Sequence, residues 1–72
     1  MTAIKQARQA AREEFDDYLD RNNATASFAV PDCVISAAKA AYSAAGGSGE
    51  VDVIGRGNRT HPVCSVEVRR TK

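Results

Sequence analysis

The chain has 72 residues and a formal net charge of +1 at neutral pH. This length excludes a multidomain organisation and leaves little room for an active-site cleft, so we expect one small domain over residues 1–72 that is not an enzyme. The balanced charge excludes bulk electrostatics as a basis for binding any one class of partner. No stretch approaches the roughly 20 apolar residues of a membrane span, and no apolar run follows the charged N-terminus. We therefore expect a cytoplasmic protein with no membrane partner.

Residues 2–22 are predicted to form a long amphipathic helix, capped by Thr2 and ended at Asn22-Asn23. At 100° per residue, a set of apolar side chains falls on one stripe of this helix. The stripe consists of Ile4, Ala7, Ala11, Phe15 and Tyr18, with Leu19 at its edge. This stripe is where the helix should meet the core.

Four carboxylates share the opposite side of the same helix. They are Glu13, Asp16, Asp17 and Asp20. Acids near a helix C-terminus cost about 0.3–1 kcal/mol each, and like charges four apart cost about 0.2–0.5 kcal/mol. Only the pairs Asp17–Arg21 and Arg12–Asp16 offset these costs. A helix selected for stability alone would be charged the other way round, so this stripe is a candidate surface for a basic partner; the alternative is a solvated face that serves solubility.

The middle of the chain predicts a short extended segment followed by a second helix. Residues 24–30 are small, β-branched or aromatic, which is typical of an edge strand, and Pro31 ends the segment. The second helix is predicted over residues 31–45 and ends at Gly46-Gly47. Its inner stripe is mostly methyl groups: Val34, Ala37, Ala38, Ala41 and Ala45, flanked by Ile35 and Tyr42.

The C-terminal third predicts a β-hairpin. Residues 50–54 and 61–70 alternate in polarity as half-buried strands, and the glycine-containing residues 55–60 connect them. The side chains expected to face the helices are Val51, Val53, Cys64, Val66 and Val68; those expected on the outer face are Asp52, Ser65, Glu67 and Arg69. The fold class is therefore α+β: two helices packed on one face of a small antiparallel sheet, in the order α-(β)-α-β-β.

No motif indicates a cofactor or a metal site. Cys33, His61 and Cys64 offer fewer ligands than a tetrahedral zinc site needs, and His61 and Cys64 would point to opposite faces of a strand. The two cysteines are predicted to be reduced, small core residues. The glycine-rich stretches are placed as turns rather than as phosphate-binding loops. The clustered acids share one wet environment, which is unsuited to acid–base catalysis.

Two functions remain in competition. In the first, the protein is an inhibitor or adaptor that presents its acidic helix face to a nucleic-acid-handling protein with a basic surface, with Tyr18 and Phe15 as aromatic anchors. In size and charge alone, the chain is similar to the small inhibitors that bacteriophages encode against host defence, such as anti-CRISPR proteins; this likeness implies a class and no particular residue. In the alternative, the basic hairpin and tail bind nucleic acid. The residues of that second surface are Arg56, Arg59, Arg69, Arg70 and Lys72.

A homodimer is a further partner hypothesis. The core is thin, and a free edge strand can pair with a second copy of the chain.

Overall fold

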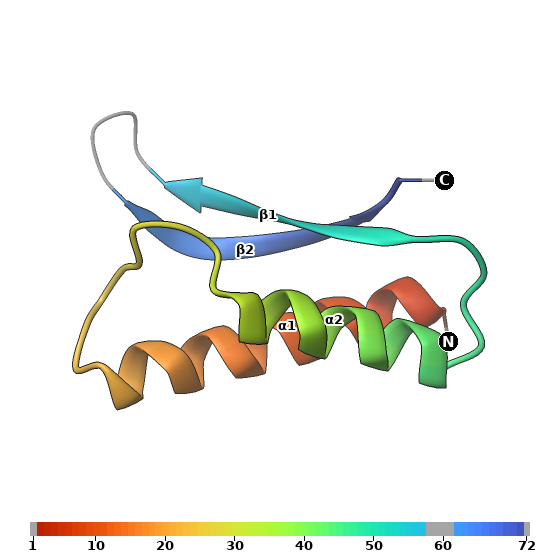
Figure 1. Cartoon of the computed structure of the whole chain (residues 1–72), viewed down its shortest axis with the longest axis horizontal. Helices are drawn as coiled ribbons and strands as arrows, with labels where there is room; N and C mark the ends of the chain where they lie inside the picture. The colour runs from red at the N-terminus through yellow and green to blue at the C-terminus, as the bar shows by residue number, and fades with distance from the viewer. Residues whose placement is uncertain (1, 58–61, 72) are drawn as a thin grey trace.

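The computed structural model describes residues 2–57 and 62–71 and has two layers, helices on one side and strands on the other (Figure 1). The elements are α1 (Ala3–Arg21), α2 (Asp32–Ala44), β1 (Val51–Gly57) and β2 (Val63–Arg70). The predicted α+β class is confirmed, with the order α-α-β-β. None of the described helices is long and apolar enough to cross a membrane.

Helix α1 begins and ends as its sequence predicts. The Thr2 side chain accepts a hydrogen bond from the Lys5 N–H at 3.3 Å, and Asn23 takes a positive φ of 52° just beyond the last turn. Ala7, Ala11 and Phe15 are buried. The small side chains of Ala7 and Ala11 let α2 pack closely along α1, so the two helices form one layer of the domain.

Helix α2 contributes Val34, Ala38 and Tyr42 to the core. Tyr42 is thus a core residue rather than a flanking one, whereas Ala45 is exposed and caps the helix end. The Tyr42 hydroxyl donates to the Ser48 carbonyl at 2.7 Å, and its ring lies 2.6 Å from where a Cβ on Gly47 would be. Glycine at position 47 therefore lets the loop after α2 lie against the tyrosine ring.

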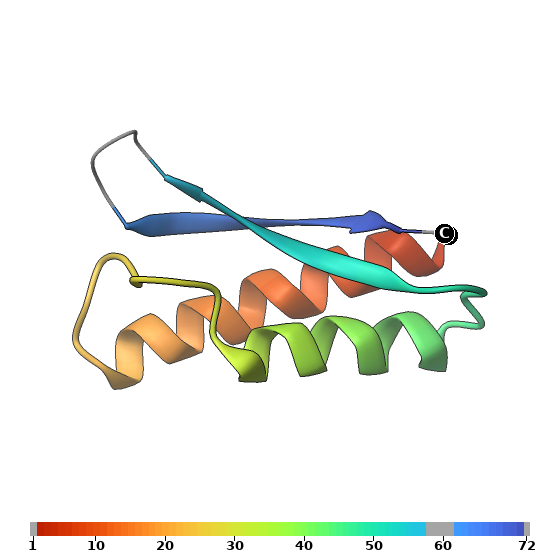
Figure 2. The ribbon, with the colours of Figure 1, turned by 45° about the horizontal axis from the view of Figure 1, so that its top comes forward.

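Strands β1 and β2 pair antiparallel, with Val53 opposite Val68. The alternation of the two strands buries one valine set against the helices: Val51, Val53, Val66 and Val68. Figure 2 shows the twisted ribbon lying across the helix pair, with α1 contacting β2 and α2 contacting β1. The sheet's other face is left to solvent, as expected for a two-layer antiparallel fold.

The edge strand predicted over residues 24–30 is reduced to a single bridge. Ser27 and Val63 exchange two backbone hydrogen bonds of 2.7 Å each, and the Ser27 hydroxyl then donates to the Ala29 carbonyl at 2.7 Å. That local bond turns the chain, and Pro31 follows before pairing could resume. The segment therefore pairs with the sheet at one position, the first residue of β2.

The prediction that Cys64 faces the core is wrong. The register passes from Arg56 opposite Ser65 to Gly57 opposite Val63, so Cys64 is the unpaired residue of a β-bulge and is exposed. The bulge turns Val63 inward instead, where its side chain lies 2.5 Å from the position of a Cβ on Gly55. Cys33 is half-buried against the core, as predicted, and both cysteines are free.

Candidate binding surfaces

The four acids of α1 are exposed side chains on one side of the helix. Only Glu13 has a side-chain partner, Gln9, whose amide donates to it at 3.2 Å. Among the residues that the structure describes, Asp16, Asp17 and Asp20 form no ion pair. The acidic face is therefore not neutralised by the part of the chain that is described.

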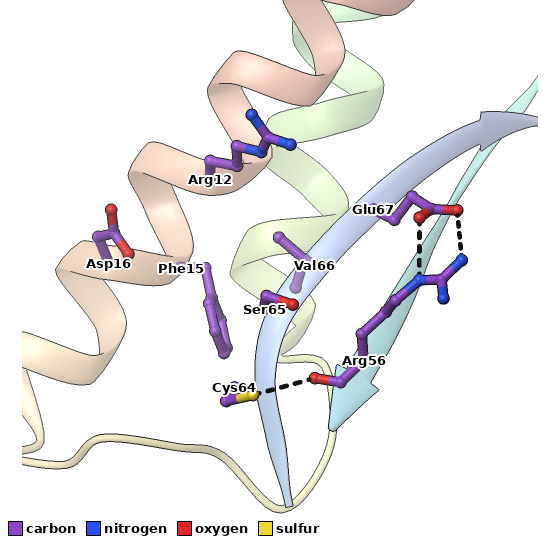
Figure 3. Close-up of a pocket in the computed structure, with 8 residues that line it drawn as sticks. All are labelled: Arg12, Phe15, Asp16, Arg56, Cys64, Ser65, Val66 and Glu67. Atoms are coloured by element: carbon purple, nitrogen blue, oxygen red, sulfur yellow. Dashed lines mark hydrogen bonds and ion pairs between the residues drawn. The ribbon is translucent and has the colours of Figure 1, made fainter. Parts of the chain in front are cut away.

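The two offsetting pairs predicted within α1 do not form. Arg21 binds Glu14 at 3.3 Å instead of Asp17. Arg12 and Asp16 form no ion pair, and the Arg12 side chain extends away from Asp16 (Figure 3). Glu14 lies beside the acidic face and is more buried than the four acids. Arg21 therefore neutralises Glu14, and Asp17 has no ion-pair partner among the described residues.

A shallow hollow lies between α1 and β2, next to the acidic face (Figure 3). Its lining residues come from these two elements and, at Arg56, from β1: Arg12, Phe15, Asp16, Arg56, Cys64, Ser65, Val66 and Glu67. The charged groups in it are two carboxylates and two guanidinium groups. The hollow is open to solvent and lined by groups of both charges. It is therefore a shallow surface groove rather than an enclosed site for a small ligand.

The hairpin face of this hollow holds a bidentate ion pair. Arg56 Nε lies 2.9 Å from Glu67 Oε2, and a second guanidinium nitrogen donates to Glu67 Oε1 at 3.1 Å. The hydrogen bonds and charge of Arg56 lower the pKa of Glu67, with smaller contributions from Arg69 and Arg8, and Glu67 in turn raises the pKa of Arg56. A carboxylate held in its charged form by several arginines is unsuited to act as a general acid.

The aromatic side chain that is exposed for contact is Phe28 rather than Phe15. Phe15 is only 2 % exposed and Tyr18 is half-buried, so Phe15 is a core residue and not a contact residue. Phe28 is 97 % exposed on the connection between α1 and α2. The alternation in residues 24–30 groups Phe28 with Val30, which packs against the core, so no local pattern indicates that Phe28 is exposed.

The basic residues of the hairpin that the structure describes do not gather into one patch. Arg56 is paired with Glu67, and Arg69 lies opposite Asp52 on the outer face. Arg70 follows on the helix side, where it lines a hollow with the start of α1. Arg59 and Lys72 fall outside the described residues.

Metal and cofactor chemistry finds no support in the geometry. Within residues 2–57 and 62–71, no group of three or more histidine, cysteine or acidic side chains is arranged to hold a metal ion. Searches against protein-family models, curated proteins and solved structures found no match. The function must therefore be argued from the residues themselves.

Proposed function

We propose that the protein is a non-enzymatic binding module that presents the acidic face of α1 to a protein with a basic surface. One observation carries the proposal: within residues 2–57 and 62–71, three aspartates of this face have no ion-pair partner, although the chain supplies an arginine to Glu14 and another to Glu67. Charge repulsion and the helix dipole both act against such an arrangement. A positive partner would remove both costs.

The spacing of the acids suits a partner that binds nucleic acid. Glu13 and Asp20 are seven residues apart, so the row extends about 10 Å along the helix at 1.5 Å per residue. A rigid row of carboxylates can take the place of backbone phosphates in a basic groove and speed association by electrostatic steering. This surface fits a class of proteins that inhibit or recruit nucleic-acid-handling proteins, which includes the anti-CRISPR proteins.

Phe28 supplies the apolar contact that the proposal needs. The connection that carries it leaves from the C-terminal end of α1, where the acids are concentrated (Figure 1). Buried aromatic side chains dominate interface energies, whereas exposed charges chiefly set rate and specificity. We therefore propose that the interface spans the C-terminal half of α1 and the part of this connection that carries Phe28.

The test compares the wild type with three variants as bait in a bacterial lysate. The variant E13Q/D16N/D17N/D20N should lose the partners that the wild type retains, and F28A should weaken the same partners. The control D32N/E50Q neutralises two exposed acids elsewhere and should retain them. A captured partner should also be displaced by added DNA or RNA, because both ligands would use its basic groove.

Undiminished capture by the four-site variant would overturn the proposal. Retardation of nucleic acid by the isolated protein, lost on replacing Arg69 and Arg70, would favour the alternative function. In that case affinity should fall steeply with salt, with a loss of about one unit of slope per arginine removed.

A further inference from the structure

The outer edge of β1 is a run of strand backbone without a neighbour in the part of the chain described. The sheet contains only β1 and β2, and the single additional bridge, at Ser27, lies on the β2 side. A two-stranded ribbon is marginal by itself, and exposed edges pair readily with other strands. The core beneath this ribbon is thin, since three of its ten buried apolar residues are alanines.

The hydrogen-bonding groups on this edge can be assigned from the ladder. The Glu50 carbonyl accepts from the Thr71 N–H at 3.0 Å, so that pair is of the hydrogen-bonded type. Because the two types alternate in antiparallel ladders, Ile54 also directs its backbone groups toward β2, whereas Val53 and Gly55 direct theirs outward. Consistently, the Val53 N–H donates to the carboxylate of Asp52 at 3.0 Å rather than to a strand.

We propose that a second copy of this chain pairs antiparallel with β1 across that edge, about a twofold axis at Ile54. This register places Ile54 opposite Ile54 of the second copy, and Asp52 and Arg56 opposite one another on both sides. Val53 and Gly55 then exchange backbone hydrogen bonds with their counterparts. The outer-face pairs would be of the narrow, non-hydrogen-bonded type, in which side chains approach most closely.

The charges of β1 make this register self-complementary. The register centred on Ile54 sets both charged side chains of β1 against opposite charges. A shift of two residues toward Val53 keeps only Arg56 in such a pair, with Glu50, and sets Asp52 against Ile54, so electrostatics favours the register centred on Ile54. The β2 edge is a weaker candidate, because Ser27 already occupies its start and the bulge at Cys64 distorts it. The result would be one four-stranded sheet with all four helices on the same face.

Helix α2 can accommodate the second copy because its flank is also complementary. α2 lies beneath β1 (Figures 1 and 2), and Lys39 lines a shallow groove there with Val51. Asp32 and Lys39 are seven residues apart on this flank, with half-buried Ile35 between them. Antiparallel α2 helices would therefore set Asp32 against Lys39 of the copy, while the acidic face of α1 stays remote and free.

Disulfide trapping tests the register directly. In a C33A/C64A background, I54C places the introduced thiols opposite one another at the axis, where a narrow pair has Cα atoms about 4.5 Å apart. The matched control D52C places its thiols about four residues out of register. Efficient cross-linking of I54C and little of D52C supports the proposal; equal yields, or none from I54C, overturn it.

A charge swap tests the same contacts without cysteines. Sedimentation equilibrium of the wild type should approach twice the chain mass of 7.7 kDa as concentration rises. D52R should weaken association at least about tenfold, since it sets like charges opposite one another twice, and D52R/R56D should recover most of the loss. Circular dichroism confirms that each variant remains folded. A wild type that stays at 7.7 kDa, or a double variant no better than D52R, contradicts the proposed interface.

Discussion

The acidic face of α1 and the outer face of the hairpin carry similar charged groups but treat them differently. On the hairpin, Arg56 holds Glu67 through two contacts of 2.9 and 3.1 Å. On α1, Asp16, Asp17 and Asp20 have no such partner among the described residues. Cross-strand neighbours bring opposite charges together, whereas these acids sit beside one another on a single helix. The comparison teaches that pairing of two strands brings opposite charges of the hairpin together, whereas a single helix offers its aspartates no such partner among the described residues.

The largest expected effect is the loss of stability on truncating a side chain on the buried side of α1. Phe15→Ala should cost about 3–5 kcal/mol of unfolding free energy, because it opens a cavity under the acidic face where the ring is 2 % exposed. Urea denaturation followed by circular dichroism measures the loss. A cost below about 1 kcal/mol would mean that α1 is held mainly by other contacts and would weaken the distinction between its inner and outer sides.

Neutralising the four acids of α1 should increase the free energy of unfolding rather than lower it. E13Q/D16N/D17N/D20N should raise the unfolding free energy by about 0.5–1 kcal/mol, since it relieves repulsion and the unfavourable dipole interaction. The measurement is thermal melting at low ionic strength, and the gain should shrink as salt is added. The control D32N/E50Q should show no such gain, because Asp32 is favourably placed in the first turn of α2. A clear loss of stability in the four-site variant would indicate that these acids serve the fold.

The smallest expected effect lies on the hairpin and appears as pH dependence. The folded-state pKa of Glu67 lies below its ordinary value of 4.5, so the pair with Arg56 stabilises the fold above that pH and is lost as the pH falls through the folded pKa. Glu67→Gln should therefore lose less stability than the wild type on acidification below pH 4.5. E50Q is the matched control, because it removes a carboxylate of the same hairpin without touching this pair. Identical acid profiles for E67Q and the wild type would contradict a specific contribution from Glu67.

The same contrast explains which residues the sequence could locate. Hydrophobic periodicity is a local property, so the helix of residues 3–21, the second helix and both strands follow from spacing alone. The exposure of the acids also follows, since they lie opposite the stripe that contains Ala7 and Ala11. Their value as a binding surface remains a prediction.

Local spacing does not predict the conformation of residues 24–30 or the orientation of Cys64. Ser27 makes two backbone bonds to Val63, which is far along the chain, and no local pattern encodes that contact. The bridge directs Phe28 outward to 97 % exposure. At the bulge, one extra residue reverses the alternation, so Val63 enters the core and Cys64 leaves it.

By itself, the sequence determined the α+β class, the helix spans, the presence of two strands, and the row of acids on α1, because each depends on periodicity within one element. The end of the first strand was predicted too early: residues 55–57 were placed in the turn, but they continue β1 in its pairing with β2. The tertiary structure decided the pairing of Arg56 with Glu67, the inward position of Val63, and the exposure of Phe28. These depend on which elements lie side by side and in what register. Distances between elements are properties of the packed chain, and a linear pattern does not contain them.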